Sequence, residues 1–76
     1  MRQRYSLAAL IINWNGAEDS IELLRSLEDM RPKDAHLEVA VIDNASALED
    51  RLLLEEFLRD WQTNIFVHFR ANRSNI

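Results

Sequence analysis

Apolar and polar residues follow each other in blocks along the chain, and the blocks predict five elements. Residues 6–13 (SLAALIIN) are uncharged and do not alternate, which is typical of a parallel strand covered by helices on both faces. Residues 37–43 (LEVAVID) and 64–69 (NIFVHF) are rich in β-branched and aromatic residues and predict two further strands. Residues 70–76 (RANRSNI) predict a polar loop.

The first segment between the strands, residues 17–30, has helical spacing. Its expected apolar face consists of Ala17, Ile21, Leu24 and Leu27. Leu23 and Met30 are expected at the flank of this face. Asn15 is the expected N-cap, and Glu18 completes a box-like pair with it. Pro32 is expected to end the helix together with Arg31.

The second segment, residues 47–61, also predicts a helix. Ser46 and Glu49 have the spacing of a capping box at its start. The expected apolar face consists of Leu53, Leu54, Phe57, Leu58 and Trp61. The acidic residues are interpreted as the solvated face of the same helix: Glu49, Asp50, Glu55 and Glu56.

The resulting order is β-α-β-α-β, which predicts the α/β class with a three-stranded parallel sheet and right-handed crossovers. Ligands of such open sheets bind at the carboxyl ends of the strands. The polar residues 13–16, 43–46 and 70–75 lie at three such ends. We therefore expect the functional site there.

Composition limits the possible functions. A chain of 76 residues forms one small domain, and without cysteine it has no disulfide and no thiolate metal site. His36 and His68 form no ligand-spaced pair, and a net charge of −4 argues against nucleic acid and anionic membranes as partners. The apolar core of the N-terminal run, residues 7–12, is too short for a signal peptide or a membrane span, so we expect a cytoplasmic protein.

Two strand-end motifs resemble a known family. The pair "IINWNG" and "VIDNAS" is similar to the start of the family 2 glycosyltransferases, above all their bacterial rhamnosyltransferase-like branch. The closing "ANRSNI" resembles the beginning of the Asn-rich loop that follows the third strand in that branch. The resemblance covers nearly the whole chain.

The resemblance implies that residues 1–76 are part of a nucleotide-sugar-binding domain, the N-terminal part of a Rossmann-like GT-A fold. It implies these nucleotide-binding residues: Asn13, Trp14, Asn15, Asp43, Asn44 and Asn72. Asp43 is the residue expected to contact the base, and its carboxylate, which only accepts hydrogen bonds, suits a uracil or thymine ring N–H. The implied donor is a UDP- or TDP-sugar, and Ser46 and residues 72–75 are expected to shape the pocket.

The chain also departs from the family pattern. It has no Asp-x-Asp motif, which in the family follows the fourth strand, and the family's catalytic base lies later still. We therefore expect no catalytic residue and no metal site in this chain, although Mg²⁺ or Mn²⁺ is expected for the full-length enzyme. The implied full-length protein transfers a sugar to a glycan acceptor in cell-surface polysaccharide synthesis, and it does so in the cytoplasm or at the inner face of the membrane. The truncated chain is expected to be inactive.

Structural interpretations of the same residues remain open. Asp43 is also a typical turn residue, and Trp14, which either packs on a ligand or anchors its loop, is expected to pack on the core. In the sheet that the resemblance implies, with strand order 3-2-1-4, the first strand is central. Without the fourth strand it is expected at an uncovered edge, which predicts weak stability and self-association. The alternative function is a stand-alone α/β binding or dimerisation module without catalysis.

Overall fold

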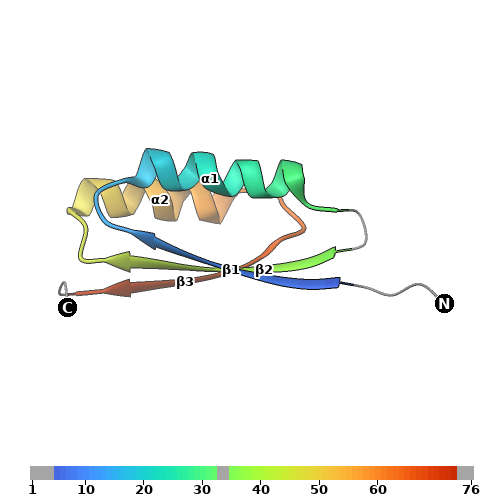
Figure 1. Ribbon diagram of the computed structural model, residues 1–76. Helices are drawn as coiled ribbons and strands as arrows, with labels where there is room; N and C mark the ends of the chain where they lie inside the picture. The colour runs from blue at the N-terminus through green and yellow to red at the C-terminus, as the bar shows by residue number, and fades with distance from the viewer. Residues whose placement is uncertain (1–4, 33–34, 74–76) are drawn as a thin grey trace.

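The computed structural model describes residues 5–32 and 35–73 of the chain, and in them two helices alternate with three strands (Figure 1). The elements are β1 (Tyr5–Asn13), α1 (Ala17–Met30), β2 (Ala35–Asn44), α2 (Leu48–Asp60) and β3 (Phe66–Asn72). The predicted β-α-β-α-β order is confirmed. No helix in the described ranges is both long and apolar enough to cross a membrane.

The three strands form one parallel sheet with the order β1-β2-β3, as the sequence predicts. Asn13 pairs with Asp43 between β1 and β2, and Asn44 pairs with Asn72 between β2 and β3. The polar carboxyl ends of all three strands therefore lie side by side at one end of the sheet. Within the described residues β1 and β3 are the two edge strands.

Both helices lie on the same face of the sheet, so the protein has two layers (Figure 1). The core between the layers consists mainly of Ile11, Leu24, Leu37, Val39, Val41, Leu54 and Ile65. The expectation that helices cover both faces of β1 is wrong for the described residues. Leu10 and Ile12 point away from the helices and are 61% and 62% exposed.

Three further details differ from the sequence prediction. β3 begins at Phe66 and continues through residues 70–72, which were expected to be loop, because their backbone pairs with residues 42–44 of β2. In α2, Leu54 is buried but Leu53 is exposed, so Leu53 does not belong to the apolar face. In α1 the expected face is confirmed at Ala17 and Leu24.

Candidate functional site

The ends of β1 and β2 are joined by two buried polar side chains. Asn13 and Asp43 are register partners, and each is only 1% exposed. Nδ2 of Asn13 donates a hydrogen bond to Oδ1 of Asp43 at 2.8 Å. Buried polar groups of this kind need partners for all their hydrogen-bonding atoms, and the two helices and the loop after β2 supply them.

Asn13 is at the centre of this network. Its Nδ2 also lies 2.9 Å from Oδ2 of Asp50 and 3.2 Å from Oγ of Ser46, so three acceptors share its two N–H groups. Its Oδ1 accepts a hydrogen bond of 2.6 Å from Oγ of Ser20. The amide is therefore fully committed to the protein, and it holds β1, α1 and α2 together at the carboxyl end of the sheet.

Asp43 organises the loop after β2. Its Oδ1 accepts the bond from Asn13, and its Oδ2 accepts a hydrogen bond of 3.2 Å from the backbone N–H of Ser46. This is the turn role that the sequence offered as the structural interpretation of Asp43. An ionised carboxylate has about four acceptor positions, so these two bonds leave capacity for further donors.

The two helix N-termini exchange their capping groups. The N-cap of α1 is Gly16, and Oδ1 of Asp50, in the first turn of α2, accepts the backbone N–H of Ala17 at 2.9 Å. The N-cap of α2 is Ala47, and Oδ1 of Asn15, in the loop before α1, accepts its backbone N–H at 2.8 Å. Each helix thus obtains a partner for a free N–H group from the other β-α unit.

The capping pairs expected from the sequence are therefore wrong. Asn15 caps the second helix instead of the first, and Glu18 is exposed. Ser46 is not the N-cap of α2, because its Oγ accepts the backbone N–H of Asn15 at 2.9 Å as well as the Asn13 amide. The spacing of capping residues along the sequence cannot show that the loop before α1 and the loop before α2 lie in contact in the folded protein.

Two loop residues have a left-handed backbone. Asn15 has φ 52° and Ala45 has φ 59°, while Gly16 has φ −130° and needs no special freedom. Asn tolerates this region, but a Cβ makes it costly for alanine. The backbone N–H of Ala45 donates to the carbonyl of Asn72 at 3.1 Å, which ties the loop after β2 to the end of β3.

Four of the expected nucleotide-binding residues are accessible at this end of the sheet, and one of them, Asn15, is exposed. Trp14 is 61% exposed, so the expectation that it packs on the core is wrong. Asn44 and Asn72 are partly buried neighbours at the ends of β2 and β3. Of the expected loop at residues 72–75, residues 74 and 75 lie outside the described part of the chain.

A cavity of about 330 Å³ lies beside this network at the start of α1, and three carboxylates line it. Its lining residues are Asn15, Gly16, Ala17, Glu18, Asp19, Asp50 and Leu53. The negative charge opposes a phosphate without an accompanying cation. Among the residues that the structure describes, no group of three or more His, Cys, Asp and Glu side chains is arranged to hold a metal ion.

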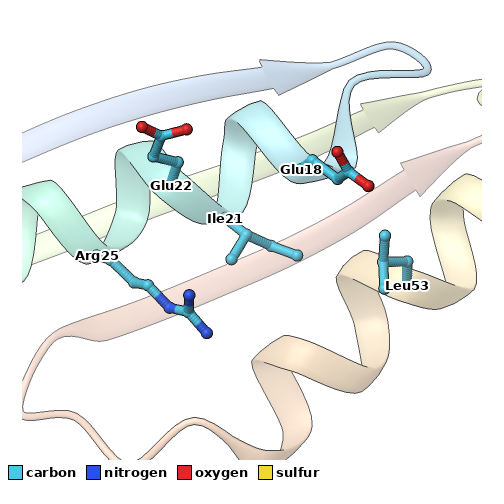
Figure 2. Close-up of a pocket in the computed structure, with 5 residues that line it drawn as sticks. All are labelled: Glu18, Ile21, Glu22, Arg25 and Leu53. Atoms are coloured by element: carbon cyan, nitrogen blue, oxygen red, sulfur yellow. The ribbon is translucent and has the colours of Figure 1, made fainter.

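A second hollow, of about 380 Å³, lies between the two helices, apart from Asn13 and Asp43 (Figure 2). Figure 2 shows Ile21 and Arg25 extending from α1 toward α2, where Leu53 lies. The guanidinium of Arg25 is 5.2 Å from the centre of the Phe57 ring. This hollow is a seam between packed helices, and we assign it no ligand.

No protein-family model, curated protein or solved structure matches the chain. The function therefore has to be inferred from the residues and their geometry. The geometry brings together Asn13, Asn15 and Asp43, and it leaves Trp14 exposed beside them.

Two members of the network, Asp50 and Ser20, were not identified from the sequence. The acidic face of α2 was interpreted as solvated, which is wrong for Asp50 because its carboxylate binds Asn13 and Ala17. The sequence did contain a sign that Asp50 is partly buried. Asp50 precedes Leu54 by four residues and therefore lies on the face of α2 that points to the core. Ser20 has the same relation to Leu24 in α1. A polar residue on an apolar stripe marks a buried polar contact.

Proposed function

We propose that this chain is the nucleotide-binding N-terminal portion of a cytoplasmic glycosyltransferase of the family 2 type. In this proposal the ligand is a nucleotide-diphosphate sugar, with UDP- and TDP-sugars preferred, and the complete enzyme transfers the sugar to a glycan acceptor hydroxyl in cell-surface polysaccharide synthesis. The 76-residue chain does not transfer sugar by itself, since it has no Asp-x-Asp motif.

The observation that carries the proposal is the meeting of three polar strand ends beside an exposed tryptophan. Asn13 and Asn72 end β1 and β3, and Asp43 is the last residue but one of β2, at the carboxyl ends of the strands, where open α/β sheets bind ligands. Trp14, at the same end of the sheet, offers an aromatic face on which a base can stack. The sequence motifs around these residues are those that resemble the family.

The geometry supports different roles for the residues. Asn13 is buried and satisfied, so its role is to hold the loops in place. Trp14 and Asn72 are accessible and are proposed to contact the nucleotide. Asp43 is proposed to accept the base N–H with its remaining acceptor capacity, after a small movement of the loop after β2. Mg²⁺ or Mn²⁺ in the complete enzyme would offset the charge of the diphosphate near the carboxylates.

The test is an NMR titration of the isotope-labelled chain with UDP and TDP, with free uridine and inorganic diphosphate added separately. We expect weak binding, roughly millimolar, with shifts confined to residues 13–16, 43–46 and 72, and uridine should reproduce most of them. Shifts with diphosphate alone would place an anion site there instead of a base site. Unchanged spectra at saturating nucleotide concentrations would refute the proposal.

A further inference from the structure

Asn15 and Gly16 form the only Asn-Gly pair of the chain, because Gly16 is its only glycine. In such a pair the backbone nitrogen of the glycine can attack Cγ of the asparagine and close a succinimide ring. Glycine permits this attack best, because it has no Cβ that shields its nitrogen and few conformational limits. Asn15 is exposed and Gly16 is partly exposed, so water reaches both residues.

The contacts of Asn15 with the loop before α2 keep the two reacting atoms apart. Oδ1 of Asn15 accepts the backbone N–H of Ala47 at 2.8 Å, and its own backbone N–H donates to Oγ of Ser46 at 2.9 Å. With φ at 52°, Asn15 also has the left-handed conformation, in which the nitrogen of the next residue lies anti to Cβ about the Cα–C bond. The attack therefore needs rotation of both the backbone and the side chain of Asn15, and its bond to Ala47 must open first.

The other asparagines that the structure describes lack this combination of glycine and exposure. Asn13, Asn44 and Asn72 are buried or partly buried, and none of them precedes a glycine. Asn64 is as accessible as Asn15 by class, but it precedes Ile65, whose β-branched side chain crowds its own backbone nitrogen. Asn64 is therefore an internal control for the reactivity of Asn15.

We propose that Asn15 is a site of spontaneous deamidation and that the exchange of caps between α1 and α2 controls its rate. When the two loops separate, the nitrogen of Gly16 loses its proton to solvent and forms a bond to Cγ of Asn15. The side-chain NH2 group takes up a proton and leaves as ammonia. Water then opens the succinimide, at Cγ to give aspartate or at the main-chain carbonyl to give isoaspartate. The reaction does not depend on nucleotide binding.

The two products have different effects on the loops. An aspartate at position 15 still accepts the N–H of Ala47, and its charge is favourable at the start of α2. In isoaspartate the main chain continues through Cβ and Cγ and is longer by one carbon atom. The geometry that serves both Ser46 and Ala47 is then lost, so isoaspartate formation leaves the N-terminus of α2 without its cap.

The first test compares the folded chain with the chain unfolded in guanidinium chloride, in the same buffer and with sodium chloride at equal ionic strength in the folded sample. Mass spectrometry of proteolytic fragments measures the conversion of each asparagine. We expect Asn15 to convert in the unfolded chain, and at least about tenfold more slowly in the folded chain. Equal rates in the two states would overturn the control by the loops. Conversion of Asn64 as fast as that of Asn15 in the unfolded chain would refute Asn15 as the site.

Ala47→Pro tests the controlling hydrogen bond, because proline has no N–H to donate to Asn15. The φ of Ala47 is −57°, which proline adopts without strain. We expect the folded-state rate at Asn15 to rise about fivefold, whereas Ala47→Val, which keeps the N–H, should retain the parent rate. Equal folded-state rates in Ala47→Pro and the parent would refute the role of this bond. Circular dichroism establishes that each variant is folded, and Ser46→Ala, which frees the N–H of Asn15, replaces Ala47→Pro if proline prevents folding.

Gly16→Ala tests the attacking residue. The nearest neighbour of the added Cβ would be the carbonyl oxygen of Trp14 at 3.8 Å, so the variant should fold. Its methyl group shields the nitrogen, and conversion of Asn15 should slow in the unfolded chain as well as in the folded one. An unchanged rate in the unfolded variant would refute attack by this nitrogen. Isoaspartate, identified by electron-transfer fragmentation, forms only through the ring, so a product that contains aspartate alone would also refute the succinimide route.

The purified products test the consequence for the fold. The chain with isoaspartate at position 15 should melt at a lower temperature than the parent, and the amides in the first turn of α2 should exchange faster. The chain with aspartate should behave like the Asn15→Asp variant and remain close to the parent. Equal melting temperatures of the isoaspartate and aspartate products would contradict the predicted loss of the cap.

Discussion

The carboxylate of Asp50, in α2, accepts the backbone N–H of Ala17, the first residue of α1, at 2.9 Å. The other oxygen of this carboxylate accepts from the buried amide of Asn13 at the end of β1. One side chain therefore caps a helix to which it does not belong and also satisfies the centre of the strand-end network. Its substitution should affect stability more than its partly exposed position in α2 suggests.

Replacing Asp50 with alanine removes both bonds. We expect a loss of about 2 kcal/mol in the free energy of unfolding, the upper range for a lost helix cap. Glu49→Ala, at the exposed neighbouring residue, should change it by less than about 0.5 kcal/mol. Urea unfolding followed by circular dichroism measures both, and equal effects of the two substitutions would contradict the capping role of Asp50.

Asn13→Ala should be the most damaging change in the network. It leaves two carboxylates and the hydroxyl of Ser20 without their common partner, and each unsatisfied buried group costs about 1–3 kcal/mol. Ser20→Ala removes one bond only and should cost about 1 kcal/mol. The order of the two urea midpoints is the readout. A Ser20→Ala midpoint as low as that of Asn13→Ala would show that the amide is not the centre of the network.

Ala45→Gly should stabilise the protein. The left-handed conformation at φ 59° costs an alanine roughly 1–2 kcal/mol, and glycine avoids this cost although it loses about 0.5–1 kcal/mol of backbone entropy. A net gain of about 0.5–1 kcal/mol follows from these two terms. A higher melting temperature is the expected result, and a lower one would show that the loop holds Ala45 without strain.

Gly16→Ala is the matching experiment at the glycine that precedes α1. Its φ of −130° suits any residue, and an added Cβ would lie 3.8 Å from the carbonyl oxygen of Trp14, an ordinary contact. We expect the melting temperature to change little, with a free-energy change below about 0.5 kcal/mol. A large loss would show that the loop before α1 needs glycine for a reason other than backbone conformation.

Trp14→Ala separates binding from folding. Because the side chain is exposed, the free energy of unfolding should change by less than about 0.5 kcal/mol. Nucleotide binding should weaken by about 1–3 kcal/mol if the base stacks on the indole. Phe66→Ala, at an exposed aromatic residue at the amino end of β3 and therefore remote from the carboxyl ends of the strands, should leave the nucleotide affinity unchanged. Equal losses in both variants would argue against stacking on Trp14.

The element order and the meeting of the polar strand ends could be predicted from the sequence. Block patterns give the β-α-β-α-β order, and right-handed parallel connections then place Asn13, Asp43 and Asn72 at one edge. Asn15 and Ser46 were also recognised as capping residues. Their partners were wrong, because capping rules treat each helix alone and both bonds join residues about thirty positions apart in the sequence.

Exposure was the other quantity that the sequence could not provide. An apolar run such as residues 6–13 indicates burial on two faces, but it does not say what covers the second face. Leu10, Ile12 and Trp14 were therefore expected inside, and the described residues leave them exposed. Of these three positions, Trp14 is the one at which a contact with the nucleotide is proposed.

The exchange of caps between α1 and α2 has a consequence for how the chain folds. A peptide containing either helix alone lacks its N-terminal partner, so it should be frayed and only marginally helical in water. The exchanged bonds span 32 and 33 residues and form only when the β1 and β2 ends have come together. The unit of β1 and α1 therefore cannot complete its folding before the unit of β2 and α2, and the reverse is also true. Hydrogen exchange at the first turns of both helices should therefore proceed through one shared opening, and the chain should fold as a single unit.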